Sequence, residues 1–164
     1  MEGVASFRGL AAAEPATRYR ELLPQLEALV TDEPDLVANL ANVAAALRAC
    51  LPAASWVGFY VLKGGELVLG PFQGNVACVR IALGRGVCGT AASERRTVIV
   101  PDVEQFPGHI ACDAGSRSEI VVPILKDGAL VAVLDVDSYQ LAAFDERDAE
   151  GLAPIAALLG TLAW

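Results

Sequence analysis

The sequence predicts an α+β domain in which a central antiparallel sheet is flanked by helices on both sides. Two helical patterns come first, two strand pairs with short glycine-bearing turns follow around a third helical pattern, and a last helical pattern closes the chain. Runs of strands and runs of helices in this order are typical of the α+β class. A chain of 164 residues, 54% of them hydrophobic, suits one core. We therefore expect one domain over residues 1–164, with residues 1–15 as an N-terminal leader segment.

The first two helical patterns are rich in alanine and leucine and cover about residues 16–30 and 34–50. Thr31 and Asp32 are the candidate caps of the second helix, because their side-chain oxygens can accept from its free N–H groups. Pro34 suits the first turn, where a missing N–H costs nothing. Cys50, at the end of this second pattern, is expected to be a packed core thiol.

Two hairpins are predicted from the strand patterns. SWVGFYVL and ELVLGPF are joined through residues 63–66, and EIVVPIL and ALVAVLDVD through residues 126–129, where glycines permit a tight turn. The second pair is apolar at nearly every position until Asp135, which predicts that both faces of the sheet are covered by helices. The last helix is expected to begin near Asp145, with Asp148 completing a capping box.

Charge excludes several classes of partner. The formal net charge of -8 disfavours binding to nucleic acid and to anionic membranes, since both require a basic surface. Glu2 and Arg8 interrupt the segment that would form a signal peptide, so a cytoplasmic location is expected.

Cytosolic thiols are normally reduced, and structural disulfides are therefore not expected. Because no C-x-x-C pair is present and His109 is the single histidine, no metal or other cofactor is expected.

Three of the four cysteines lie in glycine-bearing stretches that we interpret as loops: Cys78 in QGNVACVR, Cys88 in GRGVCGT and Cys112 in GHIACD. Loop placement favours exposure and reactivity, which indicates redox chemistry. Cys88 is expected near a helix N-terminus, where the dipole stabilises a thiolate. Cys112 is followed along the chain by the acidic residue Glu119. An inert loop thiol is the alternative for each of them, and Cys50 is assigned to the core.

Acidic residues are expected to gather at the end of the second hairpin. In LVAVLDVDS, alternation puts Asp135 and Asp137 on one face of a strand, and pairing within the hairpin brings Glu119 near them. Like charges at this distance raise at least one pKa unless a cation intervenes. The arrangement predicts a cradle for an ammonium group; the alternative is a set of solvated strand-end acids.

Aromatic side chains are expected on the same side of the sheet. Trp56, Gly58 and Tyr60 alternate onto one face of the first strand, and the small glycine would leave a gap between two rings that can hold a ligand. The two rings can equally be plain core residues with satisfied polar tips.

The stretch from Trp56 to Glu150 closely resembles the free methionine-(R)-sulfoxide reductases, which are single GAF domains. The resemblance lies in WVGFYVL, LVLGPFQGNVACVRIALGRGVCGTA, DVEQFPGHIACDAGSRSEIVVPI and VAVLDVDS. It implies a GAF-like antiparallel sheet with the substrate enclosed between the sheet and the cysteine-bearing loops.

The resemblance also implies roles for named residues. Cys112 would be the nucleophile, and Cys78 and Cys88 the resolving or recycling thiols. Although helix-terminal activation favours Cys88 as the nucleophile, we side with Cys112. The substrate would be held by the following acids and aromatic residues: Glu119, Asp135, Asp137, Trp56 and Tyr60.

The expected reaction is the reduction of free L-methionine (R)-S-oxide, with a sulfenic acid and then a disulfide on the enzyme. Glu119 or Asp137 would protonate the departing oxygen, and thioredoxin or another external dithiol would restore the thiols. A regulatory ligand-binding GAF domain and a redox sensor without turnover are the alternatives. His109 is left without a role, and the oligomeric state stays open, a homodimer included.

Overall fold

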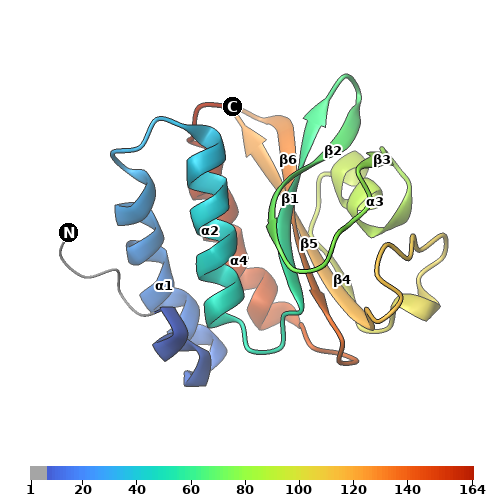
Figure 1. Cartoon of the computed structure of the whole chain (residues 1–164), viewed down its shortest axis with the longest axis horizontal. Helices are drawn as coiled ribbons and strands as arrows, with labels where there is room; N and C mark the ends of the chain where they lie inside the picture. Colours follow the sequence, from blue (N-terminus) through green and yellow to red (C-terminus); the bar gives the residue numbers. More distant parts are fainter. Residues whose placement is uncertain (1–6) are drawn as a thin grey trace.

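One six-stranded sheet forms the centre of the molecule (Figure 1). The computed structural model describes residues 7–164. The strands are β1 (Trp56–Lys63), β2 (Glu66–Gln73), β3 (Arg80–Ala82), β4 (Val98–Val100), β5 (Ser118–Lys126) and β6 (Ala129–Ser138). Their order is β3-β2-β1-β6-β5-β4, and every pair is antiparallel. The predicted α+β class with a central antiparallel sheet is confirmed.

Helices cover the two faces of the sheet unequally. The helical elements are η1 (Phe7–Ala12), α1 (Pro15–Val30), α2 (Leu36–Cys50), α3 (Gly86–Glu94), η2 (Val103–Gln105) and α4 (Glu146–Leu159). Helices α2 and α4 lie against one face, with α1 outside them, whereas α3 and the long loops lie on the other face (Figure 1). The face with one short helix is the one left for a site.

Both predicted hairpins form, with the turns at the predicted positions. Gly64 and Gly65 join β1 to β2 with φ values of 60° and 82°, and Asp127 and Gly128 join β5 to β6 with φ values of 51° and 78°. Positive φ is the conformation that a short hairpin turn needs and that glycine adopts without a steric penalty.

The helix boundaries follow local capping, with two corrections. Helix α4 has the predicted capping box between Asp145 and Asp148. The prediction of Thr31 and Asp32 as caps of α2 is wrong, because Asp35 caps this helix and accepts from the Ala38 N–H at 2.8 Å. Thr31 instead ends α1, where its N–H donates to the Glu27 carbonyl. The expected place of Pro34 in the first turn is wrong as well, because α2 begins at Leu36 and Pro34 lies before the Asp35 cap. Proline keeps the residue before it out of helical geometry, which excludes a start near residue 32.

The main core lies between the sheet and the helices α2 and α4. Alternation along β1 sends Val57 and Phe59 into this core and Trp56 and Tyr60 to the opposite face. Cys50 is fully buried here, and burial raises the pKa of its thiol to about 12. The prediction of a packed core thiol at this position is confirmed.

The second half of the expected leader packs onto the domain. Leu10 is buried, and the Arg18 guanidinium donates to the carbonyl oxygens of Leu10, Ala11 and Ala13 at 2.8–3.2 Å. The first half of the leader, residues 1–6, lies outside the described residues. Within residues 7–164, no helix combines the length and the apolar character needed to cross a membrane.

Candidate active site

Three carboxyl groups meet on the face of the sheet opposite the main core. Asp137 on β6 is aligned with Trp56 on β1 and with Glu119 on β5, so the three side chains share one face. Asp135 lies two residues earlier on β6 and therefore points the same way. The structure brings together the three acids that the hairpin pattern predicted.

These carboxyl groups are not the solvated strand-end acids of the alternative interpretation. Glu119 is 6% exposed and Asp135 is 5% exposed. Burial, with the charges of Asp135 and Asp137, holds the pKa of Glu119 well above its usual range, and a hydrogen bond with Asp135 raises it further. Burial also raises the pKa of Asp135 and that of Asp137. Among residues 7–164, Asp135 Oδ1 is the buried side-chain oxygen without a hydrogen-bond partner.

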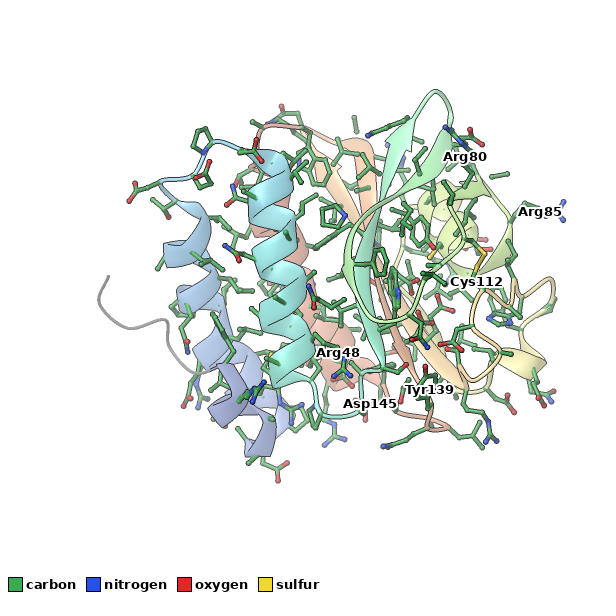
Figure 2. All side chains as sticks on the ribbon, viewed as in Figure 1. Arg48, Arg80, Arg85, Cys112, Tyr139 and Asp145 are labelled. Carbon is green, nitrogen blue, oxygen red and sulfur yellow. A yellow bond between two sulfur atoms is a disulfide. The ribbon has the colours of Figure 1, made fainter. Side chains whose placement is uncertain are left out.

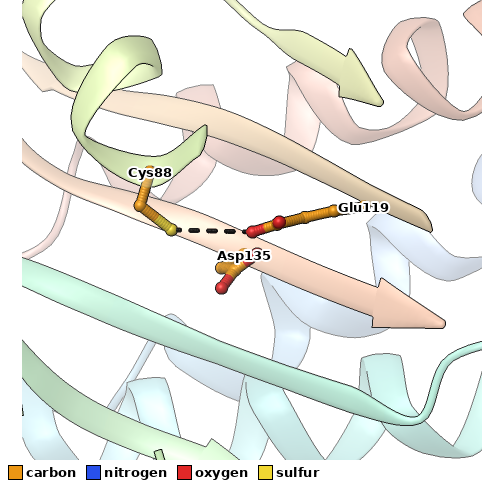
Figure 3. Close-up of side chains that lie close together, drawn as sticks. All are labelled: Cys88, Glu119 and Asp135. Atoms are coloured by element: carbon orange, nitrogen blue, oxygen red, sulfur yellow. Dashed lines mark hydrogen bonds between the residues drawn. The ribbon is translucent and has the colours of Figure 1, made fainter. Parts of the chain in front are cut away.

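Cys88 is the thiol in contact with this acidic cluster (Figure 3). Its Sγ donates to Glu119 Oε1 at 3.9 Å, and the side chain is 4% exposed. Burial and the acids hold the pKa of Cys88 well above its usual range. The predicted helix-stabilised thiolate is therefore wrong: Cys88 lies in the first turn of α3, but a helix dipole is worth about 1 kcal/mol or less at a surface, too little against burial beside carboxylates.

A pocket of about 590 Å³, including its open mouth, lies above the acids. The expected site residues that line it are Trp56, Tyr60, Cys88, Cys112, Glu119, Asp135 and Asp137. Cys78 is the expected site residue that does not line it.

The predicted gap between the two rings of β1 is filled. The Trp56 ring lies parallel to the rings of Tyr60 and Phe72, with centroids 6.1 Å and 5.2 Å away. A Cβ on Gly58 would stand 2.5 Å from Trp56 Cη2 and 2.4 Å from Phe72 Cβ. Gly58 therefore makes room for the Trp56 ring and not for a ligand, while Trp56 and Tyr60 line the pocket.

The polar tips of both aromatic residues hold the loop that carries Cys78. Trp56 Nε1 donates to the Asn75 carbonyl at 3.0 Å, and the Tyr60 hydroxyl donates to the Cys78 carbonyl at 2.9 Å. The two rings thus serve as a wall of the pocket and as an anchor for a cysteine loop.

Cys78 and Cys112 form a disulfide with Cα atoms 5.4 Å apart, across 34 residues of sequence (Figure 2). Cys50 and Cys88 are free thiols. The expectation of reduced thiols is therefore wrong for this pair. Cys78 and Cys112 lie in loops, as expected, and are half-exposed, whereas the expectation of an exposed loop thiol is wrong for Cys88, which is buried within α3.

A polar cluster of Asn75, Asp113 and Tyr139 joins the two cysteine loops to the end of β6. The Tyr139 hydroxyl donates to Asp113 Oδ2 at 2.8 Å, and Asn75 Nδ2 donates to the Tyr139 oxygen at 3.0 Å. The Gly115 N–H and the Tyr139 hydroxyl hold the pKa of Asp113 below its usual range. We call these three side chains the loop clasp.

His109 lies beside the cluster, with Nε2 4.0 Å from Glu119 Oε2. Burial lowers the pKa of His109. Burial thus favours the neutral imidazole, and the raised pKa of Glu119 favours its neutral carboxyl group, so the contact is not an ion pair.

Comparison with known proteins places this arrangement in a family. The GAF domain family model matches residues 30–162. GAF domain-containing protein A of Dictyostelium discoideum is 56% identical over 143 residues, which are 87% of this chain and 90% of that protein. The free methionine-R-sulfoxide reductase of Escherichia coli is 46% identical over 141 residues, 86% of each chain. The chain belongs to the free methionine-R-sulfoxide reductases, within the GAF domain family.

A solved structure from the same family agrees with the fold. The free methionine-R-sulfoxide reductase of Neisseria meningitidis, in complex with its substrate, superimposes with a TM-score of 0.90 at 51% identity. The match covers 98% of this chain and 94% of the other. The resemblance drawn from the sequence motifs, and the GAF fold that it implied, are confirmed.

Sequence reasoning missed the loop clasp and Ser116, whose hydroxyl donates to Asp137 Oδ1 at 3.3 Å. Tyr139 could have been found, because it directly follows the strand that carries Asp135 and Asp137. Asn75 and Asp113 gave no such signal, since they lie in loops whose position depends on the folded molecule.

Proposed function

We propose that this protein is an oxidoreductase that reduces free L-methionine (R)-S-oxide to methionine with its own thiols. The observation that carries the proposal is the disulfide between Cys78 and Cys112, because Cys112 lines the pocket built over the three acids. A disulfide is the product that two thiols leave after removing one oxygen atom from a substrate.

The proposed reaction has two steps before recycling. The Cys112 thiolate attacks the sulfoxide sulfur, the oxygen passes to Cys112 and methionine leaves, so that Cys112 becomes a sulfenic acid. The Cys78 thiol then attacks this sulfur, which forms the disulfide and releases the oxygen as water. Thioredoxin, or another dithiol, reduces the disulfide by exchange and is itself oxidised. Cys88 is a second recycling thiol in this scheme.

Glu119 is the proposed proton donor to the sulfoxide oxygen. Its raised pKa favours the protonated carboxyl group, which is the state that a general acid needs. Asp137, whose pKa is also raised, is the other acid that could supply the proton.

Asp135 is the proposed partner of the substrate's α-ammonium group. Its Oδ1 is buried and has no hydrogen-bond partner within residues 7–164, and a buried carboxylate oxygen of this kind is stabilised by a cation. A methionine residue inside a peptide has no ammonium group and would leave the carboxylate unpaired, which explains selectivity for the free amino acid. Trp56 and Tyr60 would contact the methyl end.

Turnover with a recycling dithiol tests the proposal. We expect many methionine molecules per protein molecule from the free (R)-sulfoxide, and about ten-thousandfold lower kcat/KM for its N-acetyl derivative, which lacks the ammonium group. Cys112→Ala should release no methionine, whereas Cys50→Ala, which changes a thiol in the distant core, should keep the wild-type rate. Release that stops at one methionine per protein would indicate a redox sensor, and equal rates on both substrates would remove the ammonium site.

A further inference from the structure

Cys88 is the pocket thiol that the disulfide leaves free. One oxidation of the proposed cycle is completed by Cys112 and Cys78, with Cys88 acting only as a second recycling thiol, and oxygen atoms alone suffice to bind an ammonium group. Yet the Cys88 Sγ, one Glu119 oxygen and one Asp135 oxygen all lie within 4.8 Å of one another (Figure 3). Figure 3 shows the Cys88 sulfur on the α3 side of the two carboxyl groups. A soft sulfur atom beside two hard oxygen atoms is a donor set that a metal ion uses.

We propose that Cys88, Glu119 and Asp135 form a binding site for a thiophilic divalent cation, with Zn²⁺ as the expected ion. Zn²⁺ is borderline-soft and accepts both cysteine sulfur and carboxylate oxygen. Three protein ligands leave its fourth position open to water, as in zinc sites that exchange ligands. The spacing of cysteines along the chain could not reveal this site, because the three ligands come from α3, β5 and β6.

The distances between the three ligand atoms allow metal coordination after a small movement of the side chains. With Zn–S near 2.3 Å and Zn–O near 2.1 Å, the ligand atoms of a tetrahedral site lie about 3.5 Å from one another. The Cys88 Sγ is 3.9 Å from Glu119 Oε1, and no pair in the cluster exceeds 4.8 Å. Closing the cluster around an ion therefore moves atoms by about 1 Å.

Asp135 supplies an independent sign that a cation is accommodated here. This residue is 5% exposed, it lines the pocket, and its Oδ1 has no hydrogen-bond partner in the part of the chain that the structure describes. A buried carboxylate oxygen without a donor is costly unless a cation satisfies it. A metal ion would do so while displacing the protons of the Cys88 thiol and the Glu119 carboxyl group.

A bound ion would act as an inhibitor of the proposed reaction. It would occupy the place of the substrate's ammonium group beside Asp135, so metal and substrate would exclude one another. The metal site itself does not depend on the proposed reaction, and its test is a binding measurement.

The test is a titration of the oxidised protein with Cd²⁺, which shares these ligands and gives ultraviolet charge-transfer absorption when a thiolate binds it. The Cys78–Cys112 disulfide removes two thiols, so Cys50 and Cys88 are the remaining sulfur ligands. We expect one Cd²⁺ per chain by equilibrium dialysis, with the thiolate absorption, and its displacement by Zn²⁺. Cys88→Ala should lose the absorption, and Cys50→Ala, the matched control, should keep it.

Two further variants separate the cluster from a thiol that binds metal alone. Glu119→Gln and Asp135→Asn should each weaken Cd²⁺ binding by about tenfold or more, since even outer partners of metal ligands have effects of this size. They also decide the matter if circular dichroism shows that Cys88→Ala does not fold. The proposal is overturned if no Cd²⁺ binds, if the absorption survives in folded Cys88→Ala, if it disappears in folded Cys50→Ala, or if both carboxyl variants bind as the wild type does.

Discussion

Three carboxyl groups, two buried and one half-buried, dominate the site at the scale of single residues. The pKa of each is raised by burial, so the folded protein holds protons that the unfolded chain releases at lower pH. Sites that bind cations or transfer protons tend to keep groups in such costly states. The cost has a measurable consequence, because a pKa that differs between folded and unfolded states makes stability depend on pH.

We expect the oxidised protein to lose stability as pH rises. Below pH 4.5, the pKa of this carboxyl group in the unfolded chain, Glu119 contributes its full share to the free energy of unfolding. This contribution is lost as the pH rises through the raised pKa of Glu119 in the folded protein. Glu119→Gln cannot ionise, so the free energy of unfolding should fall less steeply with pH. Chemical denaturation at a series of pH values measures the slope. Asp32→Asn, which changes an exposed carboxylate, should keep the wild-type slope; a wild-type slope in Glu119→Gln would contradict the prediction.

Gly58 should be irreplaceable because of the Trp56 ring. A methyl group there would stand 2.4 Å from Phe72 Cβ and 2.5 Å from Trp56 Cη2. Neither atom can yield easily, since one is next to the backbone of β2 and the other is held by the Trp56 hydrogen bond to Asn75. Overpacking of this kind costs about 1–3 kcal/mol. We therefore expect Gly58→Ala to lower the free energy of unfolding by this amount and to raise KM as the ring moves into the pocket.

Gly9→Ala is the matched control for this prediction, because a Cβ there has nothing within 4 Å. It should leave both the free energy of unfolding and KM unchanged. A Gly58→Ala variant with wild-type stability would show that the ring does not need this space.

The sequence predicted those parts of the site that depend on local pattern. Glu119, Asp135 and Asp137 were found because alternation and hairpin register fix their common face within a few residues. The burial of Cys88 was not found, because it results from the packing of α3 onto the sheet rather than from the neighbours of Cys88 in the chain. The reactivity expected from a helix N-terminus was therefore assigned to a thiol whose surroundings oppose it.

At the scale of elements too, features fixed by neighbouring residues were predicted, and features that depend on tertiary packing were not. The two hairpins and the α4 capping box were predicted correctly because each is fixed by a few adjacent residues. The edge strands β3 and β4 have three residues each and show no periodicity, and their pairing with β2 and β5 depends on the assembled sheet. The α2 cap was misplaced because several residues before the helix have capping side chains, and Pro34 decides among them.

The loop clasp should control how fast the disulfide closes. Its hydrogen bonds hold the loop of Cys78 and the loop of Cys112 against β6. Tyr139→Phe removes the hydroxyl that bridges Asn75 and Asp113 and leaves only their long direct hydrogen bond of 3.5 Å, so closure should slow by about twofold to fivefold. The measurement mixes reduced protein with one equivalent of substrate and counts free thiols over time after alkylation.

Leu141→Ala provides the control for the clasp, since Leu141 is an exposed neighbour of Tyr139. It should close the disulfide at the wild-type rate. If Tyr139→Phe also closes at that rate, the cysteine loops are held by other contacts, among them the Trp56 and Tyr60 hydrogen bonds.

At the scale of the whole molecule, stability and chemistry lie on opposite faces of one sheet. The face covered by α2 and α4 carries the larger core, whereas the other face carries the pocket, the smaller apolar cluster and the cysteine loops (Figure 1). This division lets the loops change their covalent state without disturbing the main core. It also means that the disulfide should contribute to stability mainly by restricting the unfolded chain.

Reduction of the Cys78–Cys112 disulfide should therefore destabilise the protein by a predictable amount. The bond spans 34 residues, and the chain-entropy relation gives about 4 kcal/mol for a loop of that length. We expect a reducing dithiol to lower the free energy of unfolding by about this much in the wild type and in Cys50→Ala. Cys78→Ala should start at the lower value and not respond to the dithiol. An unchanged denaturation midpoint on reduction would mean that the cysteine loops are held equally well without the bond, so that the proposed cycle would alternate between states of equal stability.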